Sequence, residues 1–353
     1  MIEEKRRIGY FDLMKGVCII LVVIGHCYDK LGIKIDNQHV WSALEHLRMP
    51  LYFFLSGMFF KEYSCAIEFV VKKFNRLIVP FLFLAVISVV PALFSGEVEC
   101  SVLGIKHHIT WMVKYAGYLW FLRTLFVANL VYYIYYKEVK RCKCGVQCAV
   151  MCVIVCIGWV LNEFLPQDNA IRNDYGILYS VITSMIVMPF LYVASNFRNV
   201  LSKIENIKKI HILMIFAVSA IVCYLTANGG VYLMYAKVDN TPIGFYLASF
   251  SAILMVWSMC YALRNYLSRG YLNYMGRYSI IVYLTHVPLL GALVYSGMIT
   301  KLWLLILVLL VVMPIMIALF KRCFPAFVAQ SDILICEKGK IKVDFGAFSL
   351  KNR

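Results

Sequence analysis

The sequence predicts an all-α fold: a polytopic membrane helical bundle of about ten transmembrane helices, with both termini cytoplasmic. Three observations lead to this prediction. The 353 residues are 62% hydrophobic and only 15% charged, whereas soluble chains are about 45–50% apolar and about 25% charged. Long apolar runs recur along the whole chain, and Lys and Arg gather in alternate short loops. A multi-pass membrane protein is therefore expected.

The predicted spans come from the apolar runs, because a membrane-crossing helix needs about 20 mostly apolar residues. The first run is too long for a cleaved signal peptide and contains Asp12 and Lys15. The second run is interrupted by Arg48, and the fourth by Lys114 and Arg123. The ten runs are 10–28, 42–61, 75–95, 109–136, 146–165, 177–197, 208–227, 243–263, 277–298 and 301–320.

The distribution of basic residues predicts the orientation of these spans. Of the 35 Lys and Arg residues, 25 lie in loops or termini on one predicted side and seven on the other. Cytoplasmic loops are the ones enriched in Lys and Arg, so the formal charge of +16 reflects topology, and nucleic-acid binding is not expected. We predict one membrane domain over 1–324 and a short cytoplasmic tail over 325–353. Three tail lysines are expected to rest against anionic membrane lipid: Lys338, Lys340 and Lys342.

The first run carries ionisable residues, which are costly inside a membrane and are therefore functional candidates. Lys15 and His26 are eleven positions apart, so they nearly superpose on a helix at 100° per residue, and Asp12 falls in the same arc. His26 lies roughly 24 Å along the helix from Tyr10. His26 is thus expected near the outer side of the membrane, and the other two near the inner side.

Further candidates are expected at a depth similar to that of His26. Glu45 and Arg48 share one face of the second run at a spacing of three residues, and Arg123 lies near the outer start of the fourth. A base, a carboxylate that orients it and cations for an oxyanion are the parts that acyl transfer needs. We therefore predict His26 and Glu45 as catalytic, and Arg48, Arg123 and His286 as oxyanion-stabilising or acceptor-binding. Interface anchoring by His26 and a purely structural Glu45–Arg48 pair remain alternatives.

A basic cluster on the predicted cytoplasmic side suits the phosphates of a nucleotide. Lys72, Lys73 and Arg76 precede Pro80 at the start of the third run. We predict Lys73, Arg76 and Lys15 as donor-binding residues. The alternative is ordinary positive charge of a cytoplasmic loop.

The 13 cysteines do not predict a metal or redox site. Four of them, spaced every fourth residue, share one helical face and are interpreted as a packing face of a membrane helix: Cys144, Cys148, Cys152 and Cys156. No metal site is predicted.

Four motifs, in order along the chain, resemble those of the acyltransferase 3 family of bacterial integral-membrane acyltransferases. The first runs from Tyr-Phe-Asp-Leu-Met-Lys-Gly to Gly-His, and the second is Arg-Met-Pro-Leu-Tyr-Phe-Phe-Leu-Ser-Gly. The third is Leu-Trp-Phe-Leu, and the fourth ends in Tyr-Leu-Thr-His. Within the family, the chain resembles the fucose O-acetylase-like subgroup. The motifs occupy 10–26, 48–57, 119–122 and 278–286.

This resemblance implies an O-acyltransferase of the bacterial inner (plasma) membrane. It implies transfer of an acyl group, usually acetyl, from acyl-CoA to a hydroxyl of an exopolysaccharide, capsule or O-antigen unit. Acetyl-CoA would be a co-substrate, with no bound cofactor. His26 would be the catalytic histidine, and the basic residues before the third helix would contact the donor. Many relatives have Arg-x-Arg there, whereas this chain has Lys73-x-x-Arg76.

Arg48 is a histidine in some relatives, so the resemblance implies a binding role for Arg48 rather than an acid–base role. The alternative function is a transporter or flippase of a lipid-linked saccharide, in which the same charges would line a substrate path. Transporters often show internal repeats or paired broken helices, and the sequence shows neither.

Overall fold

The structure is a computed structural model that describes residues 9–33, 37–63, 65–94, 98–166, 175–204, 207–267, 270–297, 299–337 and 339–344. About 79% of it is helical, which confirms the all-α prediction. Strands occur in the described residues only as two short two-stranded sheets, β1–β2 and β3–β4. Of the basic residues used to predict orientation, Arg6, Arg7 and Arg269 are among those outside the described residues, as is Lys338 of the tail.

The chain divides into two compact units, each described here by itself. Unit 1 comprises Met1–Leu55, Asn196–Val231 and Val238–Ile317, and unit 2 comprises Ser56–Ser195, Tyr232–Lys237 and Ala318–Arg353. The end of the chain from Ala318 onward thus belongs to unit 2. The predicted division into 1–324 and 325–353 stays a prediction.

Some elements lie wholly in one unit, and others run across a boundary. Unit 1 holds α1 (Gly9–Leu31), α12 (Lys209–Thr226), α13 (Pro242–Ala262), α14 (Arg264–Leu267), α15 (Tyr271–Arg277) and α16 (Ser279–Tyr295). The boundaries fall inside α2 (Gln38–Met58), α11 (Met188–Ile204), α17 (Leu302–Cys323), β1 (Val231–Tyr232) and β2 (Lys237–Val238).

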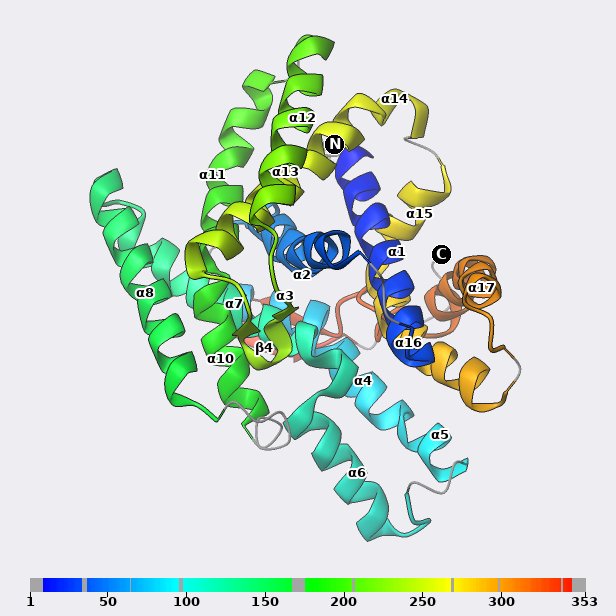
Figure 1. Cartoon of the computed structure of the whole chain (residues 1–353). Helices are drawn as coiled ribbons and strands as arrows, with labels where there is room; N and C mark the ends of the chain where they lie inside the picture. Colours follow the sequence, from blue (N-terminus) through cyan, green and yellow to red (C-terminus); the bar gives the residue numbers. More distant parts are fainter. Residues whose placement is uncertain are drawn as a thin grey trace. The chain divides into compact units, whose positions relative to one another are not determined.

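Unit 2 is made of shorter helices and one hairpin. It holds α3 (Ala66–Lys73), the π-helix η1 (Phe74–Ile78), α4 (Val79–Ile87), α5 (Val89–Phe94), α6 (Val102–Tyr115), η2 (Gly117–Leu119), α7 (Trp120–Val139), α8 (Cys144–Phe164), α10 (Gly176–Ile186), η3 (Leu233–Tyr235), β3 (Leu334–Glu337) and β4 (Lys340–Val343). α10 packs on both α7 and α8 (Figure 1).

Six helical segments in the described residues are long and apolar enough to cross a membrane, or eight if each of two bent pairs is one span. The pairs α10–α11 and α15–α16 bend by 42° and 91°. All ten predicted runs fall on helical segments. The second, α2, carries too many polar groups to pass this test, and the third breaks at η1, so that α4 has only 9 residues. The protein is multi-pass, and the count of ten stays a prediction.

α1 is the central helix of unit 1, because it packs against α13, α15 and α16 (Figure 1). Its crossing with α15 depends on two glycines. A Cβ on Gly16 would lie 1.8 Å from the carbonyl oxygen of Leu272, and a Cβ on Gly276 would lie 1.7 Å from that of Asp12. Only hydrogen fits at either position, so the two backbones touch and the direction of α1 is held firmly.

The cysteine face of α8 is only partly covered within the chain. Cys144, Cys148, Cys152 and Cys156 are all exposed. The first two are in hydrogen-bonding contact with the side chain of Tyr192 on α11, and the packing role of the whole face stays a prediction. Only 11% of the span of α8 is buried, which is typical of a helix that faces lipid.

Candidate active site

His26 on α1 and His286 on α16 face each other in unit 1. Their ring centroids are 5.2 Å apart, with ring planes inclined by 43°. His286 is 1% exposed, and its Nδ1 lies 3.0 Å from the carbonyl oxygen of Val282 and 2.8 Å from that of Tyr283. Both neighbours are acceptors, so we assign the proton of the neutral ring to Nδ1.

This assignment leaves Nε2 of His286 with a free lone pair. The atom is buried and has no hydrogen-bond partner among the described residues. Buried polar atoms normally have partners, so an unsatisfied acceptor beside His26 is suited to a hydroxyl of a substrate. Of the two roles predicted for His286, acceptor binding fits this tautomer, whereas an oxyanion would need a donor.

The carboxylate nearest His26 is one that the sequence prediction missed. Oδ2 of Asp29 lies 3.8 Å from Nδ1 of His26, and their side chains are 61% and 42% exposed. A carboxylate on one ring nitrogen keeps the proton there and leaves the other nitrogen as the base. The signal was present in the sequence, because Asp29 follows His26 by three positions and so shares its helical face.

Glu45 contacts Arg48 rather than His26, which differs from the orienting role predicted for it. Its Oε2 accepts a hydrogen bond of 3.0 Å from the backbone N–H of Val231, and its side chain is also hydrogen-bonded to Trp41. Its Oε1 lies 3.7 Å from Nη2 of Arg48. Glu45 is 8% exposed and the side chain of Arg48 is 14% exposed, so a buried carboxylate holds a half-buried cation.

Arg48 lies directly against the backbone of α1 beside His26. A Cβ on Gly25 would lie 1.8 Å from Nη1 of Arg48, so the glycine makes room for the guanidinium. The same guanidinium stacks on the ring of Trp41, 4.8 Å from its centroid. Contacts with Glu45, Trp41 and the backbone at Gly25 therefore hold the guanidinium of Arg48 next to His26. The predicted proximity of Arg48 to His26 agrees with this geometry.

Arg123 belongs to unit 2, where its hydrogen bonds go to structural partners. Nε donates to Oγ of Ser180 at 2.9 Å, and Nη2 donates to the carbonyl oxygen of Gly176 at 2.7 Å. Nη1 donates to the carbonyl oxygens of Val113 at 3.0 Å and Lys114 at 2.8 Å. Four of its five N–H groups thus tie the end of α6 to the start of α10. The predicted oxyanion role stays a prediction, and the contacts are those of a structural residue.

The three residues predicted to bind the donor lie on three elements, α1 in unit 1 and the consecutive α3 and η1 in unit 2. Lys15 is on α1, 3.5 Å from Oδ1 of Asp12. Lys73 ends α3 and Arg76 lies in η1, one turn further on. Lys73 is half-buried, with its ammonium 5.6 Å from the centroid of the Phe69 ring.

The electrostatic setting of Lys73 differs from that of an ordinary surface lysine. α3 is not one of the candidate spans. Burial, together with the neighbouring charge of Arg76, lowers the pKa of Lys73 to about 8. An ammonium that is poorly solvated gains from an anionic ligand, because the ligand replaces the solvation that burial removed.

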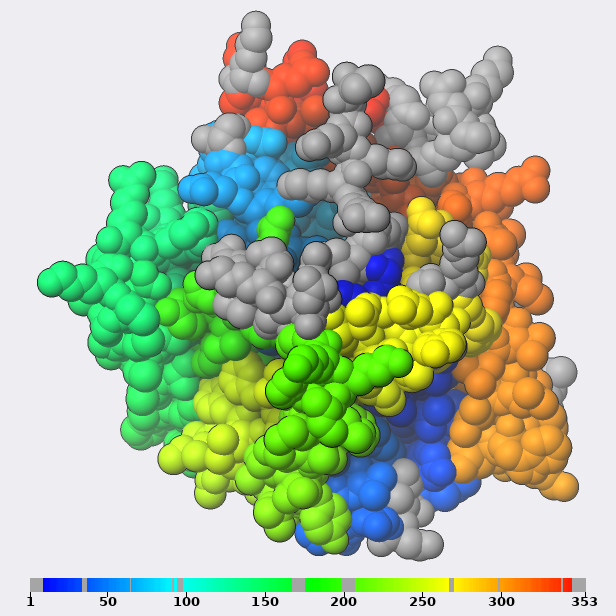
Figure 2. All heavy atoms as spheres, turned by 90° about the horizontal axis from the view of Figure 1, so that it is seen from above, coloured from blue at the N-terminus to red at the C-terminus, as the bar shows by residue number. Residues whose placement is uncertain are grey.

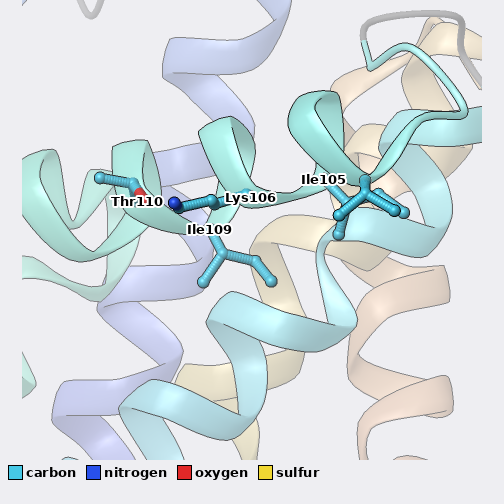
Figure 3. Close-up of a pocket in the computed structure, with 5 residues that line it drawn as sticks. Ile105, Lys106, Ile109 and Thr110 are labelled. Atoms are coloured by element: carbon cyan, nitrogen blue, oxygen red, sulfur yellow. The ribbon is translucent and has the colours of Figure 1, made fainter.

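A pocket of about 410 Å³ lies on α6 in unit 2 (Figure 3). Its wall is mostly apolar, with Lys106 and Thr110 as the polar side chains beside Val102, Ile105 and Ile109. None of the predicted site residues lines it. The candidate active site is therefore the cluster around His26.

Comparison with known proteins agrees with these features. A family model described as an acyltransferase domain (Acyl_transf_3) matches residues 8–321. No curated protein and no solved structure matches the chain. The match covers nearly the whole chain and includes both facing histidines, Arg48 and the basic end of α3. This multi-pass membrane protein therefore belongs to the acyltransferase 3 family and is a membrane acyltransferase.

Proposed function

We propose that this acyltransferase moves an acetyl group from acetyl-CoA to a hydroxyl of a cell-surface sugar or polysaccharide precursor, at the bacterial inner membrane. The observation that carries the proposal is the pair of facing histidines beside a half-buried arginine, Arg48. One histidine has an unsatisfied acceptor atom, and the other has a carboxylate on Nδ1. Together they offer a base and a site for a hydroxyl.

The proposed reaction uses each group at a stated atom. The acceptor hydroxyl approaches Nε2 of His26, and His286 accepts a hydrogen bond from a neighbouring hydroxyl. As the hydroxyl oxygen attacks the thioester carbonyl carbon, its proton passes to Nε2 of His26. The guanidinium of Arg48 stabilises the oxyanion. The carbon–sulfur bond then breaks, and the departing coenzyme A sulfur takes the proton from His26, which leaves the ester product.

Acyl transfer can be tested on reconstituted protein with labelled acetyl-CoA and a sugar acceptor. The label should appear in the acceptor with release of one coenzyme A per ester formed. Transport of a lipid-linked saccharide without coenzyme A release would instead support the flippase alternative. Mass analysis of surface glycan with and without the protein would identify the acyl group and the acceptor.

Arg48→Lys is expected to lower kcat about 100-fold, with little change in the KM for acetyl-CoA. Loss of one oxyanion donor typically costs this much, and a lysine can neither stack flat on Trp41 nor donate from the same fork. The matched control is Arg264→Lys, because Arg264 also stacks on a ring, that of Tyr261 at 3.9 Å, and lies in the same unit. Equal losses in both variants would mean that the effect is structural.

We propose that Lys73 and Arg76 bind the phosphates of the donor, and the lowered pKa of Lys73 makes this testable. A lysine with a pKa of about 8 is charged below pH 8 and neutral above it. Phosphate binding needs the charged form, so kcat/KM for acetyl-CoA, which reports the free enzyme, should fall as pH rises through about 8. Between pH 7 and 9 we expect a loss of about tenfold.

Lys73→Arg provides the control for this pH profile. Its guanidinium stays charged across the range, so the alkaline fall should disappear. Dividing the wild-type profile by that of Lys73→Arg removes the titration of the other groups. An alkaline fall that is the same in both proteins would reject Lys73 as a phosphate ligand.

A further inference from the structure

The described end of the chain is a hairpin that docks on α3. β3 and β4 pair antiparallel, with Leu334 opposite Val343 and Glu337 opposite Lys340. β3 packs on α3, and Figures 1 and 2 show the C-terminal residues beside this part of unit 2. The thiol of Cys336 on β3 is in hydrogen-bonding contact with that of Cys65, the N-cap residue of α3. This part of the tail therefore packs on α3, and lipid contact by the tail lysines stays a prediction.

One buried asparagine clamps the segment that leads into the hairpin. Asn75 in η1 is 1% exposed. Its Oδ1 accepts hydrogen bonds from the backbone N–H groups of Ile333 at 3.2 Å and Leu334 at 3.0 Å, and its Nδ2 donates to the carbonyl oxygen of Leu334 at 2.7 Å. Three bonds to one side chain specify where residues 333 and 334 sit.

This clamp places a carboxylate on the donor-side cations. Oδ2 of Asp332 lies 2.7 Å from Nζ of Lys72, and its Oδ1 lies 3.8 Å from Nε of Arg76. The side chains of Lys72, Arg76 and Asp332 are 38%, 62% and 22% exposed. A carboxylate therefore already pairs with Arg76, one of the two proposed phosphate ligands, and with Lys72 beside it, at a site that is partly open to solvent.

We propose that Asp332 is a displaceable internal ligand of the cation cluster Lys72, Lys73 and Arg76. The C-terminal hairpin thereby weakens binding of a phosphate-bearing donor until a phosphate takes the place of the carboxylate. This inference rests on the proposed donor role of the cluster and adds a means of regulating it.

Magnitudes favour displacement over a permanent structural pair. A solvent-exposed ion pair changes an equilibrium by no more than about fivefold, and a phosphate carries more charge and more acceptor oxygens than a carboxylate. The clamp at Asn75 can remain closed while the side chain of Asp332 rotates away. Only the side chain of Asp332 therefore has to move. The hairpin keeps the backbone of Asp332 in place, so the carboxylate can pair with Lys72 and Arg76 again when the phosphate leaves.

The test is the affinity of the reconstituted full chain for coenzyme A at about 50 mM salt, measured by calorimetry without turnover. Asp332→Asn is expected to bind coenzyme A about fivefold more tightly than the wild type. The gain should shrink at about 0.5 M salt, because screening weakens the competing pair. Asp332→Ser should change the affinity in the same direction, which guards against a folding defect specific to one variant.

The matched control is Glu337→Gln, which removes one negative charge from the same hairpin. Glu337 pairs with Lys342 at 2.6 Å and is not a partner of the donor-side cations. The affinity of the Glu337→Gln protein for coenzyme A should stay within about twofold of that of the wild type. An equal gain in Glu337→Gln would show a general charge effect, and weaker binding in Asp332→Asn would show that Asp332 positions the cations; either result overturns the proposal.

Failure of this inference can be told apart from failure of the proposed function. Tighter binding of coenzyme A by Asp332→Asn without acetyl transfer would sustain the internal ligand and reject the proposed reaction. Acetyl transfer by the protein, together with an unchanged affinity of Asp332→Asn for coenzyme A, would support the proposed reaction and reject the internal ligand. If neither protein binds coenzyme A, the same titration with pyrophosphate decides whether Asp332 competes with phosphate.

Discussion

His26→Ala is expected to reduce kcat/KM for acetyl transfer about 1,000-fold, because it removes the base that accepts the hydroxyl proton. A positioned general base typically contributes 100-fold to 10,000-fold. Since His26 is half-exposed and its ring packs only partly against the bundle, the variant should fold normally. The measurement is transfer of labelled acetyl groups by protein reconstituted in lipid, with the melting temperature recorded in parallel.

His39→Ala is the matched control for this variant. His39 is exposed at the start of α2, and its ring lies 5.4 Å from that of Tyr224, away from the proposed chemistry. It should keep nearly full activity. Transfer by His26→Ala within about threefold of the wild type would remove His26 from the mechanism, as would an equal loss in His39→Ala.

Gly276→Ala is expected to have the largest effect on stability. The new methyl group would lie 1.7 Å from the carbonyl oxygen of Asp12, and a backbone atom cannot turn aside as a flexible side chain can. α1 and α15 must therefore separate. Overpacking of this kind costs typically about 1–3 kcal/mol, and contact with backbone places Gly276 at the upper end. The melting temperature of the detergent-solubilised protein should fall by several degrees.

Gly291→Ala tests whether this effect comes from the crossing rather than from glycine itself. A Cβ on Gly291 would meet only the Tyr295 ring, at 3.8 Å, which is ordinary contact. Because alanine is the better helix former by about 1 kcal/mol, this variant should be as stable as the wild type or more so. If Gly276→Ala has the same melting temperature as the wild type, α1 and α15 do not pack as closely as described.

Where two residues lie on one helix, their spacing in the sequence was enough to predict that they are neighbours. The eleven-residue spacing of Lys15 and His26 placed them on one face of α1, and the spacing of Glu45 and Arg48 predicted their ion pair at 3.7 Å. Such spacings translate directly into neighbours because a helix repeats every 3.6 residues. The family was predicted for the same reason, since its four motifs are short runs within single helices or at their ends.

Pairing between helices was harder to predict. The carboxylate that lies beside His26 is that of Asp29 rather than that of Glu45. Four N–H groups of Arg123 donate hydrogen bonds to α6 and α10. Both outcomes depend on where other backbone groups lie: the N–H of Val231 donates to Glu45, and carbonyl groups at the end of α6 and the start of α10 accept from Arg123. Because the sequence was analysed one helix at a time, contacts between different helices could not be predicted from it.

The apolar content and the long apolar runs by themselves determined a multi-pass helical protein, and the spacing of charges along α1 and α2 made His26, Glu45 and Arg48 candidates for its site. These are local properties, because burial in lipid and helical periodicity act residue by residue. Only the tertiary structure decided that the rings of His26 and His286 lie side by side, that Gly25 makes room for Arg48, and that Asp332 pairs with Lys72. Each of those contacts joins residues far apart in the chain, and close packing of backbones, rather than the pattern of any one segment, selects them.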